Sequence, residues 1–179
     1  MEFKTFNPRD ALAVENLFYT VFSHSEGEQE GNLVGQLARE LMSTTDKQDL
    51  YGYVAVENGH LLGAIFFSRL TFESGIEAFV LSPVAVHSDY QRTGIGQGLI
   101  NHGLQQLRNA GVDLVITYGD PDYYIKVGFK PLSQKVIQPP HELSQPRGWI
   151  GQSLKGSLAD STAQGVCRCV HALNDKSYW

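Results

Sequence analysis

A glycine-rich stretch in the middle of the chain has the residue types of a phosphate site. It reads Gln91-Arg92-Thr93-Gly94-Ile95-Gly96 and follows an apolar, β-branched run that ends at Val86. Beyond Gly94 the apolar residues recur at helical spacing, so the pattern predicts a strand, a loop and then a helix. Glycines at the start of a helix leave N–H groups uncovered at the positive end of the helix dipole, where phosphate oxygens bind. Arg92 adds a cation beside them.

Three interpretations of this stretch stay open on the local pattern. The simplest is a glycine-rich turn that binds nothing. The second is the dinucleotide turn of an oxidoreductase, which the spacing disfavours. Gly94-x-Gly96-x-Gly98 is not G-x-G-x-x-G, and no acidic residue follows at a strand end about twenty positions on. The third is a site for the pyrophosphate of a coenzyme.

A second segment, from Gly119 to Pro131, carries paired tyrosines. It reads Gly-Asp-Pro-Asp-Tyr-Tyr-Ile-Lys-Val-Gly-Phe-Lys-Pro, so that Tyr123 and Tyr124 are adjacent. Neighbouring residues on a helix point about 100° apart, so at most one of the two side chains faces a given site. A tyrosine hydroxyl in a site can serve as a general acid. The other ring is then expected in the core or at its rim.

The two segments together resemble the GNAT superfamily of N-acyltransferases. Gln91 to Gly96 matches the Q/R-x-x-G-x-G/A pattern of that superfamily, and Tyr124 to Phe129 matches the Tyr-x-x-x-Gly-Phe pattern of the helix after its fifth strand. The Gly-Asp-Pro-x-Tyr-Tyr run, together with Leu81-Ser82-Pro83-Val84-Ala85-Val86, is similar to the YhbS-like branch of predicted N-acetyltransferases. The order of elements fits this family from about Phe3 to Lys135.

The resemblance implies an N-acetyltransferase (EC 2.3.1.-) with acetyl-coenzyme A as cosubstrate and no metal. The amine would attack the thioester directly in a ternary complex. The pantetheine arm would pair with backbone freed beside the bulge expected at Pro83, a backbone N–H near Val84 would stabilise the oxyanion, and Tyr124 would protonate the departing thiolate. Tyr124 is the expected catalytic residue, and the expected cofactor-binding residues are Val84, Ala85, Val86, Gln91, Arg92, Thr93, Gly94, Ile95, Gly96 and Tyr124.

The general base is open at this stage. Many family members carry a glutamate on the central strand, whereas the nearest acid on the predicted strand here is Glu77, at its beginning. This difference keeps an alternative function in view, a module that binds acyl-coenzyme A as a sensor without turnover. The candidates for the base are Glu26, Glu28, Glu30, His87 and an ordered water.

Other reactive residue types give weaker signals. Cys167 and Cys169 have no evident paired base, and direct transfer needs no nucleophile, so reduced, packed thiols are expected. The six histidines show no H-E-x-x-H or clustered spacing, which argues against a metal site.

The surrounding pattern predicts the elements that position these residues. Asn58-Gly59 is the favoured two-residue turn of a hairpin, and Pro83 is expected to mark a bulge in the central strand. The acidic stretch from Ser25 to Gly31 is expected to be a flexible loop, whose charge would attract a cationic amine. The predicted strands are 3–6, 51–57, 60–72, 76–86, 113–118, 149–154 and 165–173, and the predicted helices begin near 8, 32, 94 and 122.

The fold class implied by the resemblance is mixed α/β. The family fold has a central, mostly antiparallel twisted sheet of about six or seven strands, about four helices, and a V-shaped splay between strands four and five. We expect residues 1–179 to form one N-acetyltransferase domain, with its core at 3–135 and C-terminal strands within 136–173.

Bulk composition narrows the function class further. The chain has 179 residues, 42% of them hydrophobic, and a formal net charge of −5, which disfavours nucleic-acid binding. No signal-peptide pattern or membrane-length apolar run is evident, so a cytoplasmic protein without a membrane partner is expected. The expected partner is a small-molecule or protein amine, possible oligomeric states being monomer and homodimer.

Overall fold

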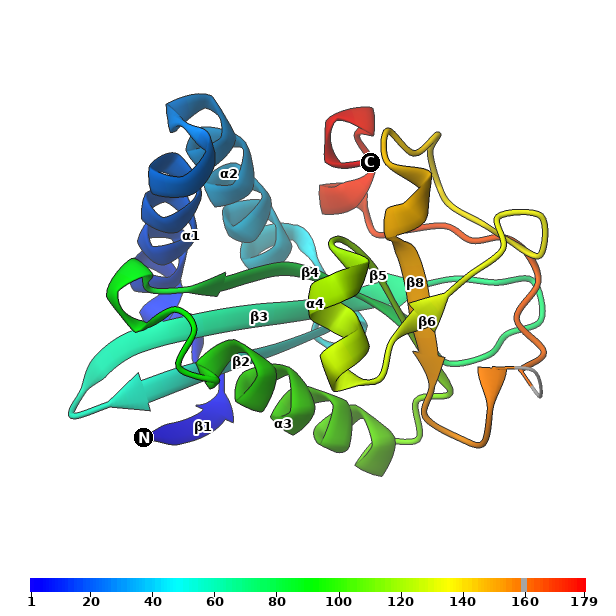
Figure 1. Cartoon of the computed structure of the whole chain (residues 1–179), viewed down its shortest axis with the longest axis horizontal. Coiled ribbons are helices and arrows are strands. Elements are labelled where there is room, and N and C mark those ends of the chain that lie inside the picture. The colour runs from blue at the N-terminus through cyan, green and yellow to red at the C-terminus, as the bar shows by residue number, and fades with distance from the viewer. Residues whose placement is uncertain (159–160) are drawn as a thin grey trace. The chain divides into compact units, whose positions relative to one another are not determined.

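The computed structural model describes residues 1–158 and 161–179, and Figure 1 shows the course of the chain. The helices are α1 (Ala11–Glu26), α2 (Glu28–Thr44), α3 (Ile95–Asn109) and α4 (Pro121–Tyr124). The strands are β1 (Glu2–Thr5), β2 (Leu50–Glu57), β3 (His60–Leu70), β4 (Ala78–Val86), β5 (Leu114–Tyr118), β6 (Lys130–Pro131), β7 (Ile137–Gln138), β8 (Trp149–Ser153) and β9 (Gly165–Val166). Single 3₁₀ turns stand at 8–10, 47–49, 88–90, 125–127, 146–148, 171–173 and 176–178.

Seven strands form one mixed sheet in the order β1-β2-β3-β4-β5-β8-β6. β4 and β5 are parallel, as the helical crossover between them requires, while β1 pairs antiparallel with β2 and β8 pairs antiparallel with both β5 and β6. The β4–β5 pairing runs from Ala78↔Leu114 to Leu81↔Thr117, and β4 continues beyond it to Val86. The mixed sheet and four α-helices confirm the expected fold class.

The chain divides into two compact units. The first comprises Met1–Phe67 with Pro83–Gly103, and the second comprises Ser68–Ser82 with Leu104–Trp179. β3 and β4 each pass from one unit into the other.

In the first unit, helices cover both faces of β3. The Phe66 ring lies 6.1 Å from the ring of Phe18 on α1, which packs along α2 (Figure 1). The next residue, Phe67, points to the opposite face because side chains alternate along a strand. There it meets α3 at Gly103, where an added Cβ would lie only 2.6 Å from the Phe67 ring. Glycine on α3 therefore permits close approach of the helix to the strand.

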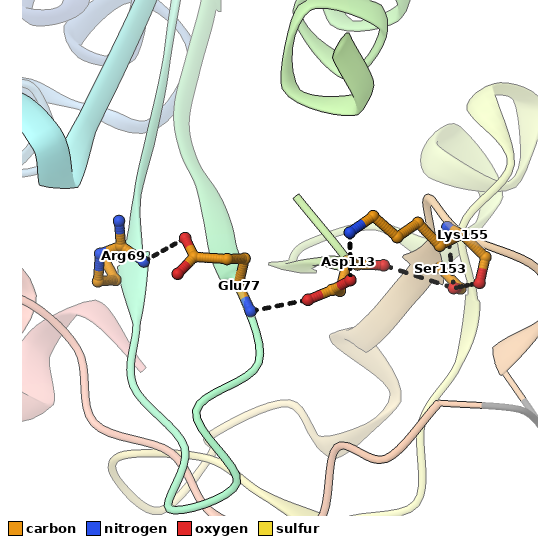
Figure 2. Close-up of polar contacts among 5 residues, drawn as sticks. All are labelled: Arg69, Glu77, Asp113, Ser153 and Lys155. Atoms are coloured by element: carbon orange, nitrogen blue, oxygen red, sulfur yellow. Dashed lines mark hydrogen bonds and ion pairs between the residues drawn. The ribbon is translucent and has the colours of Figure 1, made fainter. Parts of the chain in front are cut away.

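In the second unit, a chain of polar contacts joins the ends of several strands (Figure 2). Arg69 donates to the Glu77 carboxylate at 2.7 Å, and the Glu77 N–H donates to Asp113 Oδ2 at 2.9 Å. The second Asp113 oxygen, Oδ1, pairs with Lys155 Nζ at 2.9 Å. The Asp113 backbone oxygen accepts from the Leu154 N–H at 2.8 Å. Asp113 thus connects the start of β5 with the segments before β4 and after β8.

Several predicted elements are confirmed. Asn58 and Gly59 form the hairpin turn, with φ of 50° and 81° as a two-residue turn of this type needs. β8 and β5 lie where the pattern placed strands, and α4 with the following turn at 125–127 fills the predicted short helix. β4 is one strand from Ala78 to Val86, and its pairing with β5 ends at Leu81, two residues before Pro83; the bulge expected at Pro83 stays a prediction.

Two predictions are wrong. The acidic stretch Ser25–Gly31 is not a loop, because α1 extends to Glu26, α2 begins at Glu28, and Gly27 alone breaks the helix with φ 101°. The predicted strand 165–173 is reduced to β9, followed by a single bridge between Thr71 and Arg168. Residues 171–173 form a 3₁₀ turn.

Candidate functional site

The C-terminal end of β4 presents backbone groups on the edge that faces away from β3. The His87 N–H donates to the Leu62 oxygen on β3 at 2.8 Å. Because successive backbone groups of a strand alternate in direction, the N–H groups of Val86 and Val84 point to the other edge. The Val86 oxygen on that edge accepts from Gln91 Nε2 at 3.1 Å. Among the residues that the structure describes, no strand pairs with Val84–Val86 on this edge, because the β4–β5 pairing ends at Leu81.

The loop after β4 is held by its own short-range hydrogen bonds. The residues Ser88–Tyr90 form a 3₁₀ turn, in which His87 Nδ1 accepts from the Asp89 N–H at 3.3 Å. Thr93 Oγ1 donates to the Tyr90 oxygen at 2.6 Å. The backbone of Arg92 takes φ 62°, an uncommon conformation for a residue other than glycine, and Gly94 takes φ 88°. These two positive φ angles reverse the chain direction directly before α3.

The same loop leaves a run of backbone donors without acceptors. Among the described residues, the N–H groups from Arg92 to Gln97 make no hydrogen bond, and Gly98 is the first to donate, to the Gly94 oxygen at 2.9 Å. Gly96 in this run is itself buried. Such donors at the start of a 15-residue helix, beside the exposed Arg92, are the features that bind phosphate oxygens.

The second unit positions Tyr124 on a short helix fixed at both ends. Asp120 caps α4 by accepting the Asp122 N–H at 3.0 Å, and Pro121 occupies the first turn. After the helix, Gln152 Nε2 on β8 donates to the Val127 oxygen at 2.8 Å. A Cβ at position 119 would lie 2.7 Å from the Tyr124 ring, so any residue larger than glycine there would displace the ring.

The Tyr124 ring is surrounded by aromatic and polar neighbours. Its centroid lies 5.0 Å from that of Tyr123 and 5.6 Å from that of Phe129, both with edge contacts. Burial of the hydroxyl raises the Tyr124 pKa well above the usual tyrosine range, although part of the residue is open to solvent. A side-chain hydrogen bond with Thr117 acts in the opposite direction and lowers this pKa. Tyr124 is therefore protonated at neutral pH, the state that a general acid needs.

The candidate bases lie in different surroundings. Glu26 and Glu28 flank Gly27 at the helix junction, and Glu30 follows in the first turn of α2. Partial burial, and then the charge of Glu26, raise the Glu30 pKa, which strengthens its carboxylate as a base. Glu77 precedes β4 and is paired with Arg69.

Cysteine, metal and membrane features add little to the site. Cys167 and Cys169 are free thiols, and burial raises the pKa of both, to about 12 and about 11. Within residues 1–158 and 161–179, no group of three or more His, Cys, Asp or Glu side chains is placed to hold a metal ion. In the same part of the chain, no helix has both the length and the apolarity to cross a membrane.

Comparison with known families identifies this arrangement. Residues 12–129 match the model of the Acetyltransferase (GNAT) family, a stretch that contains both the loop and α4. The chain belongs to the GNAT acetyltransferase family. It is an N-acetyltransferase of the EC 2.3.1.- class, which confirms the family expected from the two motifs.

Two relatives from Escherichia coli K12 are similar over most of their length. The uncharacterized N-acetyltransferase YjhQ is 30% identical over 139 residues, which cover 74% of this chain and 76% of YjhQ. The uncharacterized N-acetyltransferase YhbS is 30% identical over 125 residues, covering 69% of this chain and 70% of YhbS. The resemblance to the YhbS-like branch is thereby confirmed.

Solved structures of GNAT proteins share the fold of this acetyltransferase. E. coli YhbS, solved in complex with CoA, superposes with a TM-score of 0.82 at 21% identity, covering 98% of this chain and 92% of that one. A GNAT acetyltransferase from Brucella melitensis, solved in complex with acetyl-CoA, gives a TM-score of 0.71 at 26% identity over 96% and 97% of the two chains.

The structure groups the motif residues by unit and adds others that the sequence did not indicate. Val84–Val86, Gln91–Gly96 and His87 belong to the first unit, and Tyr124 belongs to the second. Thr117 and Gln152 were not predicted, because each donates to a backbone oxygen that is distant in sequence, that of Leu81 and that of Val127. An alternating strand pattern gives the face on which Thr117 lies, but no sequence signal gives its partner.

Proposed function

We propose that this acetyltransferase transfers an acetyl group from acetyl-coenzyme A to a primary amine by direct attack within a ternary complex. The run of unpaired N–H groups from Arg92 to Gln97 carries this proposal, because it matches the needs of a pyrophosphate and of few other ligands. The similar proteins solved with CoA or acetyl-CoA support the same choice of cofactor. Residues 1–179 act as one catalytic domain.

The cofactor's pyrophosphate binds the amides of Arg92, Thr93, Gly94, Ile95 and Gly96, and the Arg92 guanidinium adds a charge-assisted contact. Gln91 supports the loop through its bond to the Val86 oxygen. The pantetheine arm pairs with the free edge at Val84–Val86 in the manner of an added strand. A backbone N–H of this edge donates to the oxygen that becomes negative when the amine attacks the thioester.

Tyr124 completes the transfer as general acid. The neutral amine forms a bond to the acetyl carbon, and collapse of the tetrahedral intermediate breaks the carbon–sulfur bond. The Tyr124 hydroxyl gives its proton to the thiolate, the nitrogen gives one proton to water as it becomes the amide, and solvent returns a proton to the phenolate. The products are an N-acetylated amine and coenzyme A, with no covalent enzyme intermediate.

The acceptor in this proposal is a cationic amine, supplied as a small molecule or on a protein. The junction between α1 and α2 carries a negative charge, because three glutamates lie there within five residues: Glu26, Glu28 and Glu30. A negative surface raises the local concentration of amines in their ammonium form. The free thiols of Cys167 and Cys169 are consistent with a reducing, cytoplasmic setting.

Calorimetric titration with acetyl-coenzyme A tests the cofactor site. We expect saturable binding by the wild type and a loss of roughly tenfold or more in Arg92→Glu, since a contact between charged groups is worth about 1.5–3 kcal/mol. Arg9→Glu is the matched control, because Arg9 is exposed, lies in the same unit and changes the net charge equally.

The outcomes of this titration decide whether the cofactor binds at the loop. Binding that weakens equally in both variants reflects net charge alone and contradicts a site at Arg92. No binding by folded wild-type protein contradicts the cofactor assignment. A positive titration leads to an amine screen by coenzyme A release, in which cationic amines are expected to react faster than neutral ones.

A further inference from the structure

The turn before α3 has an arginine at a position where glycine is usual. Gln91 has φ −65° and ψ 154°, and Arg92 has φ 62°. These are the central dihedral angles of a type II turn, which here comprises Tyr90, Gln91, Arg92 and Thr93. Glycine is favoured at the third position because a Cβ is strained at positive φ. The strain at Arg92 is therefore offset by contacts that hold the turn.

A side chain closes this turn in place of the backbone. In the usual type II turn, the carbonyl oxygen of the first residue accepts from the N–H of the fourth. Here the Tyr90 oxygen accepts from Thr93 Oγ1, at 2.6 Å. In the part of the chain that the structure describes, the Thr93 N–H makes no hydrogen bond. The Thr93 hydroxyl thus occupies the acceptor that its own N–H would otherwise use.

Other carbonyl oxygens of the loop are also occupied. The Val86 oxygen accepts from Gln91 Nε2 at 3.1 Å, which is a second side-chain donor. The His87 oxygen accepts from the Tyr90 N–H at 2.8 Å. A loop acceptor that is already occupied does not draw in one of the N–H groups that follow, so these groups stay available to an external ligand.

We propose that Thr93 is a positioning residue for the pyrophosphate of the cofactor, because its hydroxyl holds the turn closed while its own N–H stays free for a phosphate oxygen. This proposal rests on the proposed function, in which the pyrophosphate binds the amides of Arg92–Gly96. A threonine hydroxyl has one proton, and here that proton is donated to the Tyr90 oxygen. The hydroxyl therefore affects affinity through the backbone.

Two substitutions separate the hydroxyl of Thr93 from its methyl group. Valine keeps the shape and lacks the O–H donor, whereas serine keeps the donor and lacks the methyl group. In Thr93→Val the Tyr90 oxygen loses its donor, and the turn tightens until the N–H of residue 93 donates to it. One amide is then withdrawn from the cofactor. Because Thr93 is exposed, its methyl group contributes little by packing.

Calorimetric titration with acetyl-coenzyme A compares these variants. We expect Thr93→Val to lower the affinity roughly tenfold, since one hydrogen bond to a charged phosphate is lost. Thr93→Ser should bind like the wild type. Thr44→Val is the matched control, because Thr44 Oγ1 donates to the Glu40 oxygen at 2.7 Å on α2 of the same unit. This control should lose similar thermal stability and no affinity.

Amide exchange at residue 93 separates the proposed role from a merely structural one. Without cofactor, this amide should exchange fast in the wild type and in Thr93→Ser. In Thr93→Val it should exchange more slowly, because only there does it have an acceptor. NMR spectroscopy of ¹⁵N-labelled protein resolves this single amide. A loss of affinity in Thr93→Val without slower exchange at residue 93 would overturn the proposal.

The calorimetric results can overturn it independently. Equal affinities for Thr93→Val and the wild type contradict it, as do equal losses in Thr93→Val and either Thr93→Ser or Thr44→Val. If folded wild-type protein does not bind acetyl-coenzyme A, the proposed function fails and the role of Thr93 fails with it. If the wild type binds and Thr93→Val binds equally well, only the Thr93 proposal fails. Should Thr93→Val not fold, Thr93→Ala with Thr44→Ala as control gives the same comparison.

Discussion

The loop at Gln91–Gly96 and the helix that carries Tyr124 are built on different principles. The loop presents backbone N–H groups, which every residue type except proline has, and its geometry depends on two positive φ angles at Arg92 and Gly94. Tyr124 presents a side-chain hydroxyl whose acidity depends on burial and on Thr117, seven positions earlier. The geometry of the loop is therefore determined by a few adjacent residues, whereas the acidity of the Tyr124 hydroxyl is determined by packing.

This difference determines which substitutions damage each region. A backbone site tolerates changes of side chain as long as the φ angles and the space above the amides are kept. A side-chain site tolerates changes of the local backbone but fails when one atom is removed. Two substitutions test this contrast and a third gives a reference outside both regions, beginning with the largest expected effect.

Tyr124→Phe removes one oxygen atom from the second region. We expect kcat to fall by roughly 100-fold or more, the usual contribution of a general acid, with unchanged binding of acetyl-coenzyme A. The matched control is Tyr123→Phe, which removes the same atom from the neighbouring ring and should leave kcat within about twofold of wild type. Steady-state coenzyme A release measures both. A larger loss in the control would assign the acid to Tyr123 instead.

Gly94→Val tests the backbone region. A Cβ at Gly94 meets no atom within 4 Å, so the protein should fold, but φ 88° imposes a strain of about 1–2 kcal/mol and the side chain covers the amides. We expect affinity for acetyl-coenzyme A to fall roughly 100-fold, as when two charged hydrogen bonds are lost.

Gly75→Val is the control for this substitution, because Gly75 has φ 72° and the same open surroundings in the turn before β4. Both variants should lose similar thermal stability, and only Gly94→Val should lose affinity in calorimetry. Similar affinities for the two variants would mean that the amides do not bind the cofactor.

Asp113→Asn has the smallest expected effect and tests the polar contacts at the start of β5, outside both motifs. Burial alone would raise the Asp113 pKa, but hydrogen bonds from Lys155 and the Glu77 N–H, and the charge of Lys155, lower it. A lowered pKa in the folded state stabilises the protein above the unfolded pKa of about 3.9, and this contribution disappears as pH falls through the folded value.

We therefore expect Asp113→Asn to lower stability at pH 7 by less than about 1 kcal/mol, because the ion pair is partly exposed. The difference from wild type should shrink as the pH falls below about 4. Thermal unfolding from pH 7 to pH 3 measures it, with Asp46→Asn as control, since the Asp46 side chain makes no cap hydrogen bond. A difference that does not change with pH would contradict a role for the carboxylate charge.

The parts of the fold that the sequence predicted correctly are those with strong local signals. Asn58-Gly59 defined the hairpin because few dipeptides adopt two consecutive positive φ angles. The change of period at Gly94 located α3 to within one residue. In both cases the conformation is a property of a few adjacent residues.

The stretch Ser25–Gly31 was wrongly predicted to be a loop because its acidic composition was given more weight than the position of its glutamates relative to the following helix. Glu28 and Glu30 lie in the first turn of α2, where the helix dipole favours acidic side chains. The strand predicted at 165–173 failed for another reason. Its residues find their partners far away, with the Cys167 N–H on the Gln138 oxygen and Arg168 on Thr71, and the pattern of one segment does not reveal such pairs.

The unpaired amides before α3 also allow cofactor binding to be detected from their rate of hydrogen exchange. In hydrogen–deuterium exchange, an amide without an acceptor exchanges far faster than one inside a helix. The peptide that covers Arg92–Gln97 should therefore label early, while the part of α3 that follows Gly98 labels late. A cofactor seated on these amides would slow the early phase alone. The mass of this peptide then reports how much of the protein has cofactor bound. The measurement can be made in a mixture of candidate amines, before the acceptor is known.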